Sequence, residues 1–174
     1  MSPEIIFQSQ LVLGYVASLL WFGTYLMPRL RRMDKFEAQR VIATVHSFRF
    51  FGLVFILPGV VGPHLPVSFA TFAAYGDLAT GLLAISALLA VRIRSLFWLF
   101  VAAFNLTGVA DLVANYYHAI QIGLPAMAGE LGAAYVIPII YVPILMITHV
   151  VSIYWLVRSQ GFAVRAFTAD RATS

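Results

Sequence analysis

Cysteine is absent from this 174-residue sequence, and charged residues are scarce. Without cysteine the chain has no disulfide framework, no thiolate metal site and no cysteine nucleophile. Charged residues make up 10% of the chain and hydrophobic residues 61%, whereas soluble domains have about 25% charged and 45–50% apolar residues. The composition therefore excludes a soluble globular domain, a disordered chain, collagen and a coiled coil, and it predicts an integral membrane protein.

The sequence also lacks the common catalytic signatures. Lys35 is the only lysine and lies between predicted spans, which excludes a retinal-type Schiff base inside the membrane. There is no HExxH zinc motif, no Walker or glycine-rich dinucleotide motif and no G-x-S-x-G nucleophile elbow. Evidence about function must therefore come from polar residues within the membrane.

Five apolar runs are long enough to cross a bilayer, which requires about 20 residues. They cover residues 5–27, 41–61, 67–91, 96–120 and 133–157. We therefore predict an all-α fold, a polytopic membrane bundle of five transmembrane helices over residues 1–158. Residues 159–174, which are rich in Ser, Thr, Ala and Arg, are predicted to form a flexible cytoplasmic tail.

The distribution of basic residues predicts the orientation of the chain. Ten of the eleven Lys and Arg residues lie at 29–40, at 92–94 or after 157, and the connections at 62–66 and 121–132 have none. The positive-inside rule then places the N-terminus outside and the C-terminus in the cytoplasm. We expect the inner membrane of a bacterium. The same asymmetry accounts for the net charge of +4 without a nucleic-acid partner, and the lipid bilayer is the expected partner.

Two local patterns predict how particular helices begin and bend. Asp34, followed three positions later by Glu37, resembles a capping box, so a helix is expected to begin near Asp34. Pro138 and Pro143 lie inside the last span and are expected to kink it. The kink is either simple curvature of the bundle or an irregular helix that lines a cavity.

Arg49 is the one basic residue placed inside a span. It lies nine residues beyond Arg40, or ~13 Å at 1.5 Å per residue, near the middle of the bilayer. An ionisable side chain at that depth is costly and indicates a functional site. Asp77 and Asp111 are the expected partners, and His46 lies on the same helical face as Arg49. We predict that Arg49 pairs with one or both carboxylates, either as a structural lock or as a ligand, substrate or proton site.

Three spans carry stripes of polar or aromatic side chains at helical spacing. The stripes comprise Asn105, Gly108, Asp111, Asn115 and His118; Tyr141, Leu145, His149 and Ser152; and Tyr15, Ser18, Trp21 and Tyr25. A polar stripe that faced lipid would be very unfavourable, so the first two are expected to face the bundle interior or a wet cavity. The aromatic stripe is either a packing or interfacial face or the wall of a pocket for a flat ligand.

These residues can be assigned roles from their chemistry. Proton transfer would fall to Asp77, Asp111 and His149 as catalytic residues, since carboxylates and imidazoles in such surroundings can give and take protons near neutral pH. The ligand-binding residues would be Arg49, His46, Asn105, Asn115, Tyr141, Tyr15 and Trp21.

The four histidines allow a haem alternative. His46 and His149 differ in depth by only ~4 Å on the helical rise, and His64 and His118 lie near the outer surface. Two such pairs would be axial ligands of two b-type haems. Against this, His64 lies in a loop between prolines, and Arg49 has carboxylate partners ready beside the inner pair. No other metal site is predicted.

Part of the chain resembles the DoxX-like family of small bacterial membrane proteins. The resemblance rests on residues 48–55 (FRFFGLVF), Gly59 and residues 74–83 (AYGDLATGLL), and it covers residues 48–105. The shared pattern is an Arg-x-x-Gly helix followed by a helix with an acid and glycines. The resemblance implies a four-helix bundle, a link to quinone-dependent redox complexes and a site role for Arg49 and Asp77. This chain differs by an additional N-terminal span and by its histidines.

Four functions remain open at this point. The first is a membrane site that binds, with or without protonating it, a quinone, an isoprenoid or a sterol-like lipid. As an enzyme, such a protein would be an isomerase or a quinone-linked oxidoreductase subunit. The others are a b-type haem electron carrier, a proton-coupled transporter, and a structural or assembly subunit of a membrane complex. The implied cofactor is haem b or a quinone. The implied partners are a hydrophobic small molecule and either a second copy of the chain or another membrane subunit.

The orientation leads to a topological prediction. A reporter fused after Arg158 should be active in the cytoplasm, and a reporter inserted in residues 121–132 should be active outside, because the basic residues flank only one side. Paired alkaline phosphatase and green fluorescent protein fusions measure both. A cytoplasmic signal from residues 121–132 would contradict the five-span arrangement.

Overall fold

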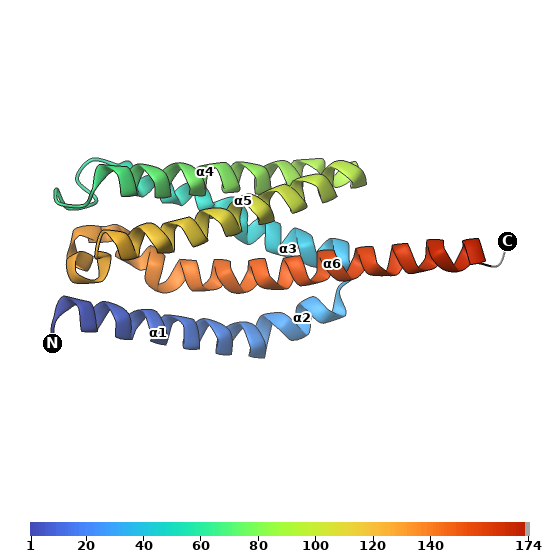
Figure 1. Cartoon of the computed structure of the whole chain (residues 1–174), viewed down its shortest axis with the longest axis horizontal. Helices are drawn as coiled ribbons and strands as arrows, with labels where there is room; N and C mark the ends of the chain where they lie inside the picture. Colours follow the sequence, from blue (N-terminus) through green and yellow to red (C-terminus); the bar gives the residue numbers. More distant parts are fainter. Residues whose placement is uncertain (173–174) are drawn as a thin grey trace.

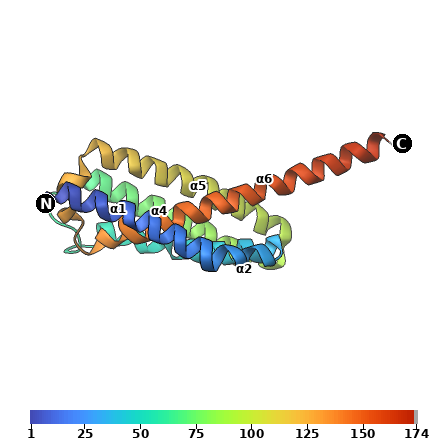
Figure 2. The same cartoon turned by 90° about the horizontal axis from the view of Figure 1, so that it is seen from below.

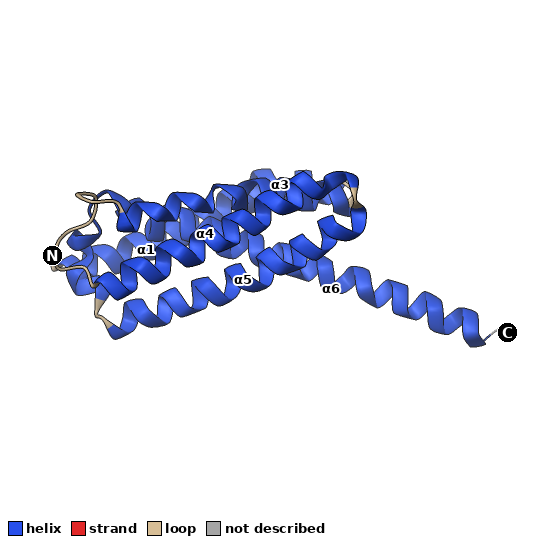
Figure 3. Ribbon diagram, turned by 90° about the horizontal axis from the view of Figure 1, so that it is seen from above, coloured by secondary structure: helices blue, strands red, loops and turns tan. Residues whose placement is uncertain are grey.

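The structure, a computed structural model, describes the backbone of residues 1–172 and the side chains of residues 1–158. This part of the chain is all-helical, without strands, and short loops join the helices at the two ends of a long bundle (Figure 3). Four helical stretches are long and apolar enough to cross a membrane, namely Pro3–Arg32, Val67–Arg92, Arg94–Gln121 and Ile137–Arg158. The predicted all-α membrane class is therefore confirmed at this level.

The chain runs back and forth along the bundle, and several of its passes are made of two or more helical segments in succession (Figure 1). The first part of the chain comprises α1 (Pro3–Trp21), η1 (Phe22–Leu26), α2 (Met27–Arg32), α3 (Lys35–Ser47) and η2 (Phe48–Ile56). The second part comprises α4 (Val67–Leu89), η3 (Ala90–Arg92), α5 (Arg94–Gln121), η4 (Leu124–Tyr135), η5 (Ile137–Tyr141) and α6 (Val142–Ala172). The start of α1 and the end of α6 lie at opposite ends of the molecule (Figure 1).

The predicted start of a helix at Asp34 is confirmed. The Asp34 carboxylate accepts hydrogen bonds from the backbone N–H groups of Phe36 at 2.8 Å and Glu37 at 3.0 Å. These N–H groups have no partner inside the helix, so the cap satisfies them. The segment then changes at Phe48 from α-helix to the tighter 3₁₀ form of η2. The buried residues of η2 are Arg49, Gly52 and Phe55, three positions apart as the three-residue turn of a 3₁₀ helix requires.

The last span is irregular where its prolines predicted a kink. Residues Ile137–Tyr141 form a π-helical turn, η5, with Pro138 inside it and Pro143 just after it. Pro143 has no N–H for the carbonyl of Ile139, four residues earlier. Gly14 of α1 packs on that carbonyl so closely that a Cβ on residue 14 would overlap the oxygen. The irregular turn is thus one of the places where α1 packs closely on the rest of the bundle.

Two apolar clusters occupy the two ends of the bundle interior. The Phe55 cluster, at the end that holds η4, includes Phe7, Phe55, Phe69, Leu124 and Leu131. The Phe97 cluster, at the end that holds α2, includes Leu30, Ile42, Phe97, Val101 and Phe104. On α4, Ala74 belongs to the first cluster and Ala84 to the second, and Asp77 lies between them. The buried charges therefore form a layer between two apolar regions.

The C-terminal helix is longer than the sequence pattern predicted. The last span was expected to end at Val157, but α6 continues to Ala172 and projects beyond the bundle (Figure 2). A flexible cytoplasmic tail over residues 159–174 stays a prediction. The segment contains no proline and is rich in Ala and Arg, which are good helix formers.

Close packing of α4 on η2 yields a stability prediction. A Cβ on Gly81 would lie 2.9 Å from the backbone nitrogen of Phe50, so Gly81→Leu should force the two segments apart and lower the melting temperature in detergent. Gly23→Leu is the matched control, because nothing lies within 4 Å of a Cβ built there. Equal melting temperatures of the two variants would contradict the packing.

Candidate functional site

Arg49 is the centre of a buried ionic cluster contributed by η2, α4, α5 and α6. Its side chain is fully buried. The guanidinium Nε donates to Asp77 Oδ1 at 2.7 Å, and Nη2 donates to Asp111 Oδ2 at 2.5 Å. Arg49 was predicted to pair with one or both carboxylates; the pairing is confirmed, and it involves both of them. The short bonds are charge-assisted, which offsets part of the cost of removing three charges from water.

The third guanidinium nitrogen, Nη1, connects the ionic cluster to α6. It lies 3.3 Å from His149 Nε2 and 3.5 Å from the carbonyl oxygen of Gly108. Since Arg49 can only donate, His149 Nε2 is the acceptor and its Nδ1 carries the proton. His149 Nδ1 donates to Asn105 Oδ1 at 2.9 Å, which agrees with that neutral tautomer.

The hydrogen bonds continue in one direction from His149 towards the Phe97 cluster. Asn105 Nδ2 donates to Ser152 Oγ at 2.7 Å, and Ser152 Oγ donates to Gln39 Oε1 at 2.7 Å. Gln39 Nε2 closes the chain on the backbone oxygen of Ser152 at 3.0 Å. Gln39 was not predicted, although its position two helical turns before His46 placed it on the same face. The polar stripes of α5 and α6 therefore face the bundle interior, as predicted.

Three glycines make room for the ionic side chains. A Cβ on Gly52 would meet the carboxylate of Asp77, and one on Gly76 would meet that of Asp111. A Cβ on Gly108 would lie 2.7 Å from Arg49 Nη1 and would also overlap His149. Each helix thus presents bare backbone where a neighbouring charge is seated. The cluster depends on close approach of helices as well as on complementary charge.

The histidines do not form the paired layers that two haems require. The rings of His46 and His149 contact each other, with their centroids 4.0 Å apart and their planes tilted by 41°, which leaves no space for a porphyrin between them. Both nitrogens of His149 are engaged, and His46 Nε2 contacts Thr148 Oγ1 at 3.1 Å. His64 lies in an exposed loop, and His118 packs against Phe72 instead. The residues present do not fit a haem.

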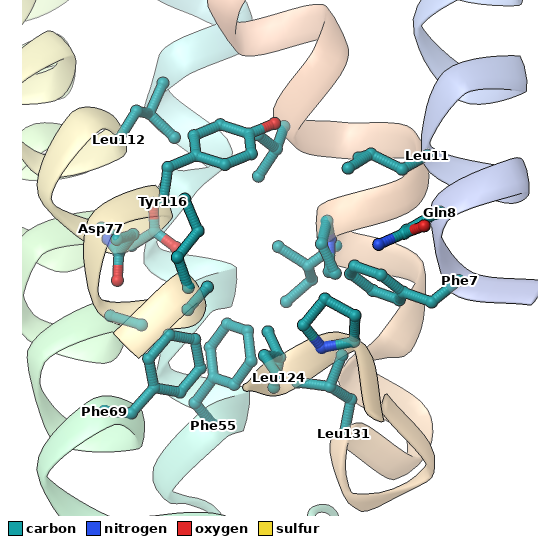
Figure 4. Close-up of a pocket in the computed structure, with 18 residues that line it drawn as sticks. Phe7, Gln8, Leu11, Phe55, Phe69, Asp77, Leu112, Tyr116, Leu124 and Leu131 are labelled. Carbon is teal, nitrogen blue, oxygen red and sulfur yellow. The ribbon is translucent and has the colours of Figure 1, made fainter. Parts of the chain in front are cut away.

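An apolar cavity of about 290 Å³ ends on the ionic cluster. Figure 4 shows Phe7, Gln8 and Leu11 of α1 on one side and Asp77 and Tyr116 on the other. The remaining walls come from η2, α4, α5, η4, η5 and the start of α6, and they include Phe55, Phe69, Ala73, Leu112, Asn115, Ala119, Leu124 and Leu131. Asp77 is the only charged side chain in this lining.

The aromatic residues predicted as ligand walls are dispersed. Tyr15 hydrogen-bonds Tyr116 through their hydroxyls at 2.6 Å, so α1 is tied to α5 beside the cavity. Tyr141 donates to the carbonyl oxygen of Val45 at 3.0 Å, where α3 tightens into η2. Trp21 is 47% exposed on the outer face and does not line the cavity. Sequence spacing identified a face of α1 but not which part of it meets the bundle.

The cavity includes residues that the sequence pattern did not single out. Asn115, which was predicted, donates to Asp111 Oδ1 at 2.9 Å and borders the cavity. Tyr116, Phe55 and Phe69 were not predicted, because aromatic residues in an apolar chain carry no distinguishing signal. Phe7 and Gln8 were missed because only the tertiary position of α1 brings them to Asp77.

The apolar helices and the buried charges together indicate a polytopic helical membrane protein. The chain belongs to the family described as Domain of unknown function (DUF8737), whose model matches residues 6–157. No curated protein and no solved structure matches the chain. The matched range includes every residue of the ionic cluster and of the cavity lining.

Removal of the Arg49 charge should lower the stability of the protein by more than the loss of side-chain packing alone would. Arg49→Met leaves two buried carboxylates facing each other without compensation, so we expect a loss of about 3–5 kcal/mol in the free energy of unfolding. Adding Asp77→Asn and Asp111→Asn should recover much of that loss. Reversible unfolding in mixed micelles measures each variant.

Arg40→Met is the control for this series, because Arg40 pairs with Glu37 at the partly exposed surface. Its effect should stay within about 1 kcal/mol. Additive losses in the triple variant would show that the charges do not compensate one another.

Proposed function

We propose that the protein binds a hydrophobic small molecule, of the quinone, isoprenoid or sterol-like class, in the cavity beside Asp77. The observation that carries this proposal is an apolar cavity of about 290 Å³ with one charged group at its wall. Small-molecule sites are typically apolar pockets of about 300–1,000 Å³ with a few placed polar groups. The apolar lining suits the body of the ligand, and Asp77 suits its polar head.

We further propose that the chain crosses the membrane five times, with the N-terminus outside. The crossing to be added to the four long apolar helices is the second along the chain. It consists of α3, with 13 residues, and η2, with 9 residues. At 1.5 Å per α-helical and 2.0 Å per 3₁₀ residue it extends about 38 Å, enough for a hydrocarbon core of about 30 Å. Its charged first turns lower its hydropathy, but its length and its place inside the bundle support a crossing. The cavity would then lie in the outer half of the membrane.

The chemistry available at this site is proton exchange. Asp77, Asp111 and His149 are linked through the guanidinium of Arg49. A proton gained or lost at one carboxylate therefore changes how strongly Arg49 interacts with the other groups. If the bound molecule is also transformed, an isomerisation or a quinone-linked redox step is the reaction we propose. The structural alternative, a lock between helices, uses the same ion pairs but requires no cavity.

The test is whether the purified protein retains a hydrophobic molecule in the cavity. Ala119→Phe fills the cavity from α5, whereas Val113→Phe adds the same side chain on a 56%-exposed face of the same helix. Mass spectrometry of the organic extract should detect a molecule in the wild type and in Val113→Phe, and at least about tenfold less in Ala119→Phe. Equal retention by both variants would place the molecule elsewhere and overturn the proposal.

A further inference from the structure

The ionic cluster is not balanced in charge. Arg49 contributes one positive charge, while Asp77 and Asp111 contribute two negative charges when ionised. His149 adds none, because it accepts from Arg49 through Nε2 and donates through Nδ1 as a neutral ring. The cluster therefore has an excess of one negative charge in a buried layer. Such a charge is costly unless a cation or a proton accompanies it.

The two carboxylates differ in how completely they are hydrogen-bonded. Both oxygens of Asp111 accept a bond, from Arg49 Nη2 at 2.5 Å and from Asn115 Nδ2 at 2.9 Å. Asp77 accepts one bond through Oδ1, and its Oδ2 receives none from the side chains that the structure describes. Asn115 Oδ1, which is buried and also belongs to the cavity lining, has no partner in the described part of the chain either, but it is uncharged. Asp77 is therefore where an acceptor without a donor and the excess charge coincide.

Asp77 is also the carboxylate that borders the cavity. Its residue is 7% exposed, and it stands at the cavity wall opposite Gln8 (Figure 4). The other polar side chains of the lining are Gln8, Asn115 and Tyr116, and their hydrogen bonds go to Glu4, Asp111 and Tyr15 instead of Asp77. A molecule in the cavity can therefore supply the donor for Oδ2. A donor that also carries positive charge would complete both the hydrogen bonding and the charge balance.

We propose that the ligand is a lipophilic amine, protonated when bound, whose N–H donates to Asp77 Oδ2. This assignment rests on the proposed function and narrows it to one kind of head group on an isoprenoid- or sterol-like hydrocarbon body. A quinone would present a carbonyl oxygen, an acceptor, to a carboxylate that already lacks a donor. A hydroxyl would supply the donor but not the charge. The apolar body would pack against Phe7, Phe55 and Phe69.

Three probes of equal chain length separate these head groups: decylamine, decanol and 2-decanone. Binding is measured by calorimetry at pH 7.5 on the protein in phosphatidylcholine nanodiscs, with empty nanodiscs subtracted for partition into lipid. We expect decylamine to bind the wild type at least tenfold more tightly than decanol, and decanol more tightly than 2-decanone. Asp77→Asn should abolish the preference for the amine. Glu37→Gln, which removes a partly exposed acid paired with Arg40, should keep it.

The outcomes distinguish this proposal from the one on which it rests. Decanol or 2-decanone binding as tightly as decylamine, with all binding lost in Ala119→Phe, would overturn the amine assignment and leave a hydrophobic-ligand site. Failure of decylamine to bind, while a molecule is still extracted from the wild type, would also overturn the amine assignment and leave the hydrophobic-ligand site. No binding and no extracted molecule would overturn both. The wild-type comparison of the three probes decides the assignment even if Asp77→Asn does not fold.

Discussion

The need to compensate one buried cation organises this bundle. Arg49 has no exposed surface, and its three guanidinium nitrogens are directed at α4, α5 and α6. Each of those helices must therefore present a carboxylate, an imidazole or a carbonyl at one depth and in one orientation. The apolar regions on either side of the layer can tolerate exchange among similar side chains, whereas the layer itself has a single arrangement that satisfies its charges. The ion pairs specify which helix faces which.

Glycine residues also determine which helices can pack together. The carboxylates lie against bare backbone at Gly52 and Gly76, and Arg49 lies against Gly108. In a membrane the hydrophobic effect does not drive helices together, so close backbone contact and hydrogen bonding between helices contribute most of the association. The same positions therefore serve packing and electrostatics at once, and neither can be changed without affecting the other.

Sequence reasoning identified the cluster but not the cavity. Burial of a polar side chain is costly, so a charge in a long apolar run or polar residues at intervals of three and four can be recognised from sequence alone. These signals identified Arg49, Asp77, Asp111, Asn105 and His149. The cavity depends on how α1 leans on the irregular turn at Pro138, which no local pattern encodes. The paired histidines do not fit haems for a related reason, because helical depth brought His46 and His149 to one level but could not show that their rings contact each other directly.

The 3₁₀ winding of η2 has a geometric consequence for the region between the charges and the cavity. At 120° per residue, Arg49, Gly52 and Phe55 stand in one straight row, with the cation at one end and a wall of the cavity at the other. At the 100° per residue of an α-helix, the same six-residue step would turn Phe55 by about 120° away from Arg49. A change in the winding of this short segment would therefore rotate the cavity wall relative to the cation. The shape of the cavity and the position of the Arg49 side chain can change only together.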